Sequence, residues 1–461
     1  MWRNYVICVL IGLLLVSTGG DVLLWRQAAT AQAEAERLRA QVRSAQDQIN
    51  DLQAENEQLK LAPTPQAPAP TVAAAPQDAN TSLLLAIQTQ VSRLRGLTSK
   101  GNVNFRFLDH DALRSYFVQK FGRDYLPQER ETDQKLLQTL GLLGPNDDLA
   151  QILLDVLTEQ VIGSYDEDDK SMYIVSDSGQ FGAEEKTTFA HEFTHVLQDQ
   201  YYDLNKLSPK HPDNDDRSLA IQALLEGDAV LIQRLWAQQY LTAAEQAQLG
   251  QGGEDSKLFS APPFVRDQLL FPYGDGFNFV RQILQTSSGY SGVDEVFRTP
   301  PESTTQILHP DKYRQHQKPL EVALPDLPKA LGAGWREIHS SVFGEFGFRE
   351  FLERFTDRTR AQRGAAGWAG DRWSLLEKDD RQAVVLKTVW ETDNDAQQFF
   401  DTFGLALKNR FGGAKEDAST DHQSLLASTN ASDVRRSAQT VTAVISFDRP
   451  SVDAILTALQ G

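Results

Sequence analysis

The chain has 461 residues, 41% of them hydrophobic, and a formal net charge of −18 from 63 acidic and 45 basic side chains. This length exceeds one typical domain, and the hydrophobic fraction excludes a fully disordered chain. The acidic excess argues against a nucleic-acid partner, because phosphate contacts need clustered Lys and Arg. Cys8 is the only cysteine, which excludes an internal disulfide.

The N-terminal residues 1–26 contain an apolar run over residues 5–16, and two interpretations fit it. One is a cleaved signal peptide, whose apolar core spans about 7–15 residues. The other is an uncleaved transmembrane anchor that ends at the interfacial Trp25. No small-residue cleavage site follows the run directly, which favours the anchor, whereas Asp21 weakens it. The anchor predicts a single-pass protein of the cell membrane with its folded part outside the cytoplasm, and cleavage predicts a secreted protein.

Residues 27–61 repeat apolar side chains at alternating steps of four and three, with Val42, Ile49 and Asn56 at the a positions of a heptad and mostly Leu at d. This pattern favours a parallel coiled-coil dimer, and therefore a homodimeric stalk. A single amphipathic helix is the alternative, but the stretch offers it no core to pack on. Pro and Ala dominate residues 62–80, which predicts a semi-rigid linker.

The first globular region, residues 81–333, begins with alternating helical and strand patterns. Periodicity predicts a strand over 103–108 and helices over 83–97, 111–121, 132–143 and 147–160. Residues 161–175 are typical of two strands around an acidic turn. That turn matches no calcium-loop motif, so a solvated turn is the simpler interpretation. An edge strand of this hairpin could pair with an extended peptide.

Residues 187–200 contain the pattern H-E-x-x-H without Pro or Gly, which predicts a helix. His191 and His195 are four apart and therefore share one helix face. Two imidazoles in this arrangement suit a tetrahedral Zn²⁺, and Glu192 could take a proton from a metal-bound water. The alternative is a helix whose polar face carries these residues by chance.

A zinc site needs a third protein ligand, and the predicted helix over 218–235 offers Glu226 on an otherwise apolar face. Burying an unpaired carboxylate is unfavourable, so Glu226 either binds the metal or pairs with Arg217 or Arg234. Asp228 is a rival ligand on a different side of the same helix.

Two aspartates could instead orient a ligating histidine through a hydrogen bond. Asp228 is one, and Asp199, one turn after His195, is the other. A solvated aspartate at the end of the helix is an equally good interpretation of Asp199.

The H-E-x-x-H motif followed by Glu226 on the next helix resembles the gluzincin arm of the zincin metallopeptidases. The string over 190–200, Ala-His-Glu-Phe-Thr-His-Val-Leu-Gln-Asp-Gln, is similar to that of bacterial zincin-like proteins. The resemblance implies a mostly helical domain with a small sheet, His191, His195 and Glu226 as zinc ligands, and Glu192 as general base. It covers only about residues 160–230. Glu226 also lies in Glu-Gly-Asp rather than the familiar Asn-Glu-x-x-Ser-Asp context.

Peptide hydrolysis profits from a donor that meets the developing oxyanion. Tyr273, in an aromatic segment over 271–277 that precedes a helix, and His309, near the end of a segment over 300–310, are the candidates. Each also fits a purely structural role, as a packed aromatic ring or a capping histidine.

The second region, residues 334–461, predicts a small α+β unit. Helices are expected over 346–355 and 395–411, strands over 384–392 and 440–447, a turn over 367–372 and a mobile loop over 412–436.

The sequence thus predicts an α+β protein whose function is that of a membrane-anchored zinc metallopeptidase acting on peptides or proteins. One alternative is a non-catalytic zincin-fold module that binds a partner and is displayed on the coiled-coil stalk. Another is a metal-dependent hydrolase of non-peptide substrates.

Overall fold

The computed structural model describes residues 77–159, 163–175, 181–209, 214–249, 256–412 and 414–460. The predicted anchor and coiled coil, and all but the end of the predicted linker, lie outside these residues. Within them, no helix combines the length and the apolar character that crossing a membrane requires.

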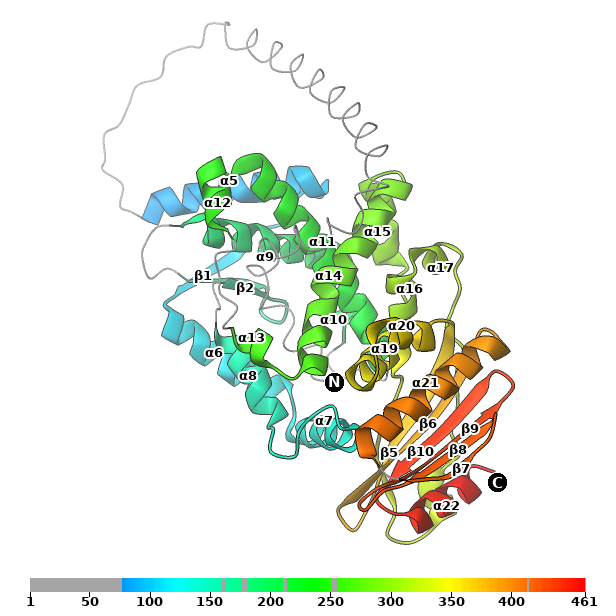
Figure 1. Cartoon of the computed structure of the whole chain (residues 1–461). Helices are drawn as coiled ribbons and strands as arrows, with labels where there is room; N and C mark the ends of the chain where they lie inside the picture. The colour runs from blue at the N-terminus through cyan, green and yellow to red at the C-terminus, as the bar shows by residue number, and fades with distance from the viewer. Residues whose placement is uncertain are drawn as a thin grey trace, which may run out of the picture.

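The described chain is a mixed α+β structure, which confirms the predicted class. A helical part with one small sheet adjoins a C-terminal part built on a larger sheet (Figure 1). The elements up to residue 248 are α5 (Gln77–Arg95), β1 (Asn104–Leu108), α6 (His110–Asp124), α7 (Pro127–Leu140), α8 (Leu149–Glu159), β2 (Gly163–Asp166), β3 (Ser171–Val175), α9 (Ala183–Tyr202), α10 (Leu204–Leu207), α11 (Asp215–Tyr240) and α12 (Ala243–Gln248). The remaining elements are α13 (Lys257–Ser260), α14 (Pro263–Thr286), α15 (Tyr290–Arg298), α16 (Thr304–Leu308), α17 (Pro310–Arg314), α18 (Leu327–Leu331), β4 (Arg336–Ser341), α19 (Gly344–Phe355), α20 (Arg358–Ala365), β5 (Trp368–Lys378), β6 (Arg381–Trp390), α21 (Asp393–Phe411), β7 (Ala414–Ala418), β8 (His422–Leu426), β9 (Ala431–Ser437), β10 (Thr440–Ser446) and α22 (Arg449–Ala458).

The small sheet has the strand order β1-β3-β2. The predicted hairpin is confirmed: β2 pairs antiparallel with β3, from Gly163 opposite Ile174 to Asp166 opposite Ser171. β1 pairs parallel with the other side of β3. β2 is therefore an edge strand among the described residues, and it lies against α9.

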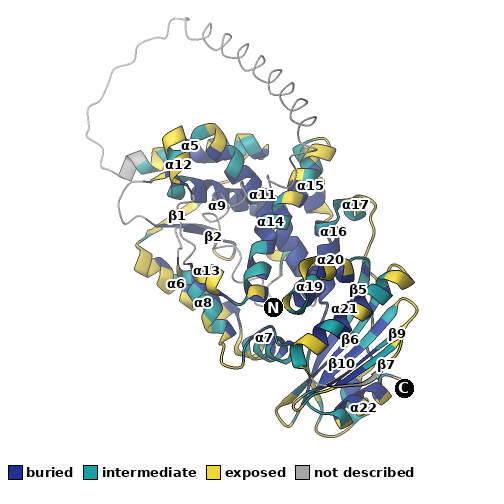
Figure 2. Ribbon diagram, viewed as in Figure 1, coloured by how far each residue is buried: buried dark blue, intermediate teal, exposed yellow. Residues whose placement is uncertain are grey.

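Helix α11 is the central element of the helical part. Its residues from 218 to 233 are all buried, because α9 packs on one side and α14 on the other (Figure 2). The approach of α14 is close enough to need glycine on both helices. A Cβ on Gly227 would lie 2.3 Å from the backbone of Gly276, and one on Gly276 would lie 2.1 Å from the carbonyl oxygen of Ala223. Gly227 follows Glu226 directly, so the unusual Glu-Gly-Asp context has a packing reason.

The large sheet is wholly antiparallel and has the order β4-β5-β6-β10-β9-β8-β7. Neighbouring residues of its central strands point to opposite faces. Val384 packs with the cluster that contains α21, whereas Val385 packs with the cluster that contains α22. In β10, Ile445 likewise packs with the cluster that contains α21, and Val444 with the cluster that contains α22. Because helices cover both faces, these strands are apolar at successive positions rather than at every second one.

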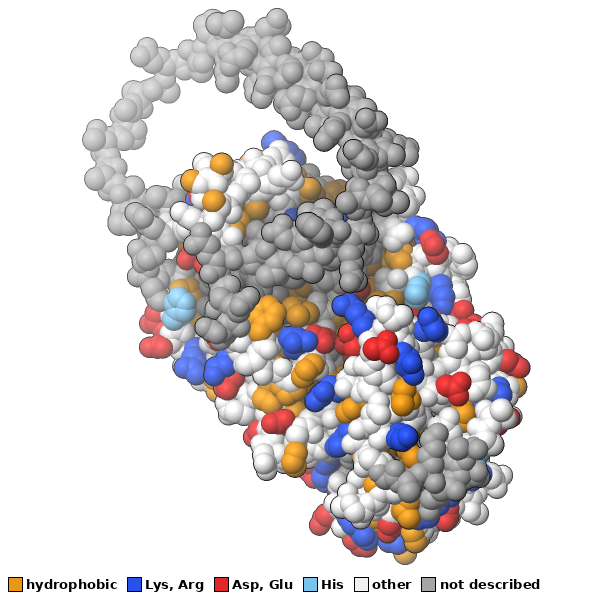
Figure 3. Space-filling view, viewed as in Figure 1, with side chains coloured by type: hydrophobic (Ala, Val, Ile, Leu, Met, Phe, Trp, Pro, Cys, Tyr) orange, Lys and Arg blue, Asp and Glu red, His pale blue; other side chains and the backbone are white. Residues whose placement is uncertain are grey.

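The surface in view carries charges of both signs. Figure 3 shows Lys and Arg side chains interspersed with Asp and Glu over the C-terminal half. The net negative charge is therefore not gathered into a single acidic patch on this face.

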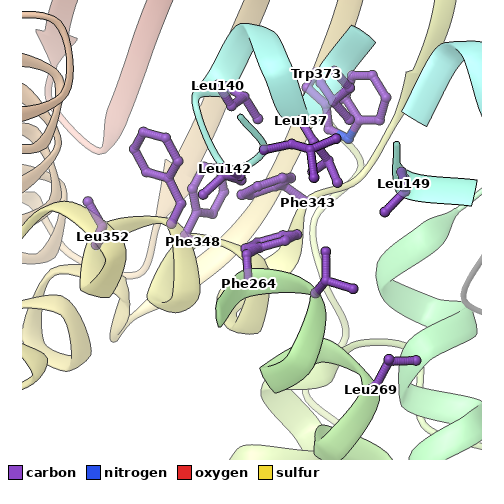
Figure 4. Packing of buried hydrophobic residues seen from close by; sticks show 14 of the residues in the cluster. Leu137, Leu140, Leu142, Leu149, Phe264, Leu269, Phe343, Phe348, Leu352 and Trp373 are labelled. Atoms are coloured by element: carbon purple, nitrogen blue, oxygen red, sulfur yellow. The ribbon is translucent and has the colours of Figure 1, made fainter. Parts of the chain in front are cut away.

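One hydrophobic core continues from the helical part into the C-terminal part. Figure 4 shows Leu137 and Leu140 of α7 close to Phe264 at the start of α14, Phe343 just before α19 and Trp373 of β5. All five are at most 7% exposed. This continuous apolar cluster therefore contains residues from both sides of the domain boundary that the sequence suggests at residue 333.

Three local predictions are wrong. Residues 367–372 are not a turn, because strand β5 begins at Trp368 with an irregular register there. Residues 412–436 are not one loop, because strands β7, β8 and most of β9 lie there. The segment over 271–277 does not precede a helix but lies inside α14, which continues through Pro272.

Candidate metal centre

The two histidines of the H-E-x-x-H motif lie side by side on α9. This helix has no internal Pro or Gly, and the Glu185 carboxylate caps its start by accepting a hydrogen bond from the Gly182 N–H at 2.9 Å. The Nε2 atoms of His191 and His195 are 3.2 Å apart. Both imidazoles therefore present the same ring nitrogen to one point.

Glu226 of α11 completes a compact three-residue cluster. Its Oε2 lies 3.1 Å from Nε2 of His191 and 3.5 Å from Nε2 of His195. Among the described residues, these three side chains form the group that could hold a metal ion. Of the ionisable groups in the described part of the chain, the two histidines pair with Glu226, and neither Arg217 nor Arg234 is one of its partners.

The separations between the three ligand atoms match those in a tetrahedral zinc site. Bonds of about 2.0–2.1 Å in a tetrahedron place neighbouring ligand atoms about 3.3 Å apart. The three observed separations, 3.1, 3.2 and 3.5 Å, scatter around this value. In addition, Oε1 of Glu226 is buried and has no hydrogen-bond partner. The donor set and its spacing therefore fit zinc.

Two glutamines determine which ring nitrogens face the cluster. Nδ1 of His191 lies 3.1 Å from Oε1 of Gln233, and Nδ1 of His195 lies 2.8 Å from Oε1 of Gln198. An amide oxygen only accepts, so each Nδ1 carries the hydrogen and donates it. In the neutral imidazole, each Nε2 then keeps a lone pair for a metal.

The orientation of Gln198 is itself fixed. Its Nε2 donates to the carbonyl oxygen of Leu225 and to Oδ2 of Asp228, each at 3.0 Å, so its Oε1 must face His195. Asp228 also accepts from Nε of Arg95 at 2.9 Å, in an ion pair whose two side chains are fully buried. Arg95 reaches Asp294 at 2.7 Å as well. A chain of polar contacts thus links the centre to α5 and α15.

The pKa values of the three cluster residues reflect their burial and their mutual electrostatic interactions. Burial lowers the pKa of His191. Burial opposes the charge on His195, yet the Glu226 carboxylate raises its pKa to about 9. Burial likewise opposes the charge on Glu226, and His195 and His191 lower its pKa to about 2. A proton shared by this cluster therefore competes with a metal ion for the same lone pairs.

Glu192 projects from the same helix towards strand β2. Its Oε2 accepts a hydrogen bond from the backbone N–H of Tyr165 at 2.8 Å. Burial raises the pKa of Glu192 to about 8, although His195 and the Tyr165 N–H act in the opposite direction. A metal ion in the cluster would oppose this rise by electrostatic attraction to the carboxylate and would lower the pKa of Glu192.

The other predicted residues divide into those near the cluster and those elsewhere. The ring of Tyr273 stacks on His191, with centroids 6.3 Å apart. Asp228 contacts Gln198 rather than a histidine, so it supports His195 through one intermediate side chain. Asp199 accepts from the Tyr165 hydroxyl at 2.6 Å and from Lys170, and thereby ties α9 to the hairpin. His309 pairs with Glu345 of α19 at 2.7 Å.

The candidate centre is enclosed. His191, His195 and Glu226 are 2, 2 and 1% exposed, and Glu192 is 4% exposed. Enclosure strengthens electrostatic interactions among these groups.

Sequence reasoning missed Gln198, Gln233 and Arg95. Gln198 lies three residues after His195 and Gln233 lies seven after Glu226, so helical periodicity places each on the same face as its neighbour. Those spacings could have indicated both. Arg95 is 133 residues from its partner Asp228, and no local pattern predicts that contact.

Fold and site together define a mixed α+β protein with a buried His-His-Glu cluster. Comparison with known proteins adds little to this. Residues 332–456, from the start of the large sheet into α22, match a family described as a domain of unknown function (DUF8575). No curated protein matches the chain. A crystal structure from Chloroflexus aurantiacus, described as a candidate hydrolase with a novel fold, is 17% identical with a TM-score of 0.34, over 54% of this chain and 93% of that one.

Proposed function

We propose that the chain is a zinc-dependent metallopeptidase of the zincin type. The observation that carries the proposal is the convergence of two histidine Nε2 atoms and a Glu226 carboxylate at tetrahedral spacing, with both Nδ1 atoms held by glutamine oxygens. His191, His195 and Glu226 would hold the metal. Three protein ligands leave one position for water or substrate, as catalytic zinc sites do.

Zinc bound there would supply a water of lowered pKa, near 7, and would polarise the scissile carbonyl. Glu192 is the group that holds and moves the proton. Its carboxylate accepts a proton from the attacking water and passes it to the leaving amine. The hydrogen bond from the Tyr165 N–H restrains one carboxylate oxygen, which keeps Glu192 beside the cluster.

Strand β2 supports a peptide as the substrate. It is the edge strand of its sheet among the described residues, and the Tyr165–Glu192 hydrogen bond joins it to the proposed base. An extended peptide that pairs with this edge would lie beside α9. Tyr273, stacked on His191, is the better placed of the two oxyanion candidates.

The proposal includes the location that the sequence predicts. Residues 1–26 would anchor the chain in the cell membrane or direct its secretion, and residues 27–61 would join two copies. The folded part would then act outside the cytoplasm, on a stalk.

One observation favours the second candidate function, a non-catalytic zinc-binding module. The proposed ligands are at most 2% exposed, as expected of a metal that only stabilises a fold. In that case zinc would be bound but no peptide would be cleaved.

Replacing Glu192 by Gln tests the proposed mechanism. The wild-type chain should cleave an unfolded protein substrate with a zinc-dependent rate. Glu192→Gln should keep its zinc, because Glu192 is not a ligand, but its turnover should fall by about 10²–10⁴-fold with the loss of the general base. The matched control is Glu184→Gln in the first turn of α9, which should cleave like the wild type.

Undiminished turnover in Glu192→Gln would refute the mechanism. A wild-type chain that binds zinc tightly and cleaves no peptide would support the non-catalytic module instead.

A further inference from the structure

A cavity of about 720 Å³ lies where α7, α14, α19 and α21 meet. Its walls are the segment over 141–145 after α7, the segment over 257–263 that leads into α14, and two arginines, Arg354 and Arg410. Small-molecule sites typically measure about 300–1,000 Å³, so this volume suits a small ligand. None of the proposed zinc ligands lines it.

The two arginines face this cavity without a carboxylate partner among the described residues. Nε of Arg410 is buried and has no hydrogen-bond partner. Burial and the neighbouring Arg354 both lower the pKa of Arg410. Arg354 is exposed, whereas Arg410 is partly buried. An unneutralised Arg410 is unexpected in a chain with 63 acidic residues, because a partly desolvated charge is normally paired.

Structural roles do not account for the pair. Arg354 lies 5.7 Å from the ring centre of Phe355, and Arg410 lies 5.1 Å from that of Phe411. The side chain of Arg410 also occupies the space where a Cβ on Gly141 would lie. These contacts place the guanidinium groups but neutralise neither.

The two acidic side chains in the cavity wall are engaged elsewhere. Oδ2 of Asp147 accepts from the Gly144 N–H at 2.8 Å. Oδ1 of Asp155 accepts from Nε2 of Gln151 at 2.6 Å. Neither contributes to the pKa of Arg410. Lys257 adds a third cation to the lining.

We propose that this cavity binds the phosphate group of a small phosphorylated molecule, with Arg354 and Arg410 as the principal donors. A guanidinium presents its N–H groups as a fork that matches phosphate or carboxylate oxygens. One tetrahedral phosphate can accept from both forks at once and can neutralise two charges, whereas one carboxylate matches a single fork. The proposal does not depend on the zinc centre.

Phosphate of this kind has two sources, a soluble phosphomonoester or the headgroup of a lipid. Calorimetric titration of the purified full chain with inorganic phosphate and with pyrophosphate tests the first. Sedimentation with phosphatidylcholine vesicles, with and without phosphatidic acid, tests the second.

Saturable binding is expected, and Arg354→Gln and Arg410→Gln should each weaken it by at least about tenfold. The matched control is Arg363→Gln on α20, an exposed arginine outside the cavity, which should bind like the wild type. The unfolding midpoint of each variant without ligand verifies its fold. It should change little, because each substitution also relieves like-charge repulsion.

Arginine-dependent binding to phosphatidic acid vesicles alone would assign the lipid source, and binding of the soluble probes alone would assign the free one. Absence of saturable binding in every arm would overturn the proposal. Equal weakening of binding by Arg363→Gln would show that the binding is nonspecific electrostatic attraction and would overturn the proposal. Citrate serves as the carboxylate comparison, and citrate binding as tight as that of pyrophosphate would overturn the assignment to phosphate.

Discussion

At the residue scale, the geometry of the candidate centre depends on side chains that lie outside the three proposed ligands. Gln198 and Gln233 hold the histidine tautomers, and Asp228 with Arg95 holds Gln198. Amides rather than carboxylates contact the Nδ1 atoms, so among the described residues Glu226 is the carboxylate that contacts both imidazoles. With zinc bound as proposed, the histidines would be neutral ligands.

Replacing Gln198 by Leu should weaken zinc binding by about 10–100-fold, the usual effect of removing a group that orients a ligand. The His195 ring would lose the acceptor that fixes Nδ1–H and with it the orientation of Nε2. Competition with a chromogenic chelator measures the dissociation constant. Gln239→Leu, at an exposed position of α11, is the control and should leave the zinc dissociation constant unchanged. An unchanged dissociation constant in Gln198→Leu would instead show that other groups set the His195 tautomer.

The sequence predicts part of this centre. The four-residue spacing brings His191 and His195 together, and burial of a lone carboxylate singles out Glu226. The structure brings all three together. His309 illustrates the limit: its partner Glu345 comes from α19, and residue type alone cannot distinguish an oxyanion donor from a histidine that is hydrogen-bonded to a structural carboxylate.

At the element scale, the distance between α11 and α14 determines where Glu226 lies. Gly227 and Gly276 allow the two backbones to meet. Any side chain there would push α14 away and would rotate or shift the turn that carries Glu226.

Replacing Gly227 by Ala should therefore destabilise the fold by about 1–3 kcal/mol, as overpacking of a core does. It should also weaken zinc binding. Urea denaturation measures the first and metal titration the second. Gly274→Ala in α14 is the matched control: a Cβ there meets nothing within 4 Å, so the helix should gain up to about 1 kcal/mol. A Gly227→Ala variant as stable as the wild type would show that α14 can shift freely.

The sequence predicts the helices better than the strands, for a physical reason. The periodicity that predicts α9 and α11 is local, since each helix forms its hydrogen bonds within itself. Strand β9, with the sequence Ala-Ser-Asp-Val-Arg-Arg-Ser, has little apolar character and forms because β10 and β8 pair with its two sides. Strand preference depends on such neighbours, so the sequence of a polar stretch like this one predicts a loop.

At the scale of the whole molecule, the helical part and the C-terminal sheet are joined by polar contacts as well as by the shared core. Glu377 of β5 is buried and accepts from Nζ of Lys135 of α7 at 2.6 Å and from Gln382 at 2.9 Å. Arg336 of β4 also contacts it. Burial opposes ionisation, yet these donors lower the pKa of Glu377 to about 2.

This depressed pKa predicts how stability depends on pH. Because the folded-state pKa lies below the ordinary glutamate value of 4.5, the Glu377 carboxylate stabilises the fold above about pH 4.5, and this contribution is lost as the pH falls towards 2. Glu377→Gln should therefore lower the free energy of unfolding near neutral pH by about 1–3 kcal/mol. The difference from the wild type should shrink near pH 3.

Urea denaturation at both pH values checks this. Glu321→Gln, at an exposed position, is the control and should have no effect at either pH. A Glu377→Gln difference that is the same near neutral and near pH 3 would contradict the account.

Metal content tests most directly whether His191, His195 and Glu226 bind zinc together, as proposed. The full chain, stripped of metal and exposed to zinc, should retain about one zinc ion per chain. Glu226→Ala should stay folded and bind zinc at least about 100-fold more weakly, a loss of about 3 kcal/mol, whereas Glu184→Ala should bind like the wild type. A folded wild-type chain that retains no zinc, or a Glu226→Ala variant that retains it undiminished, would contradict the claim.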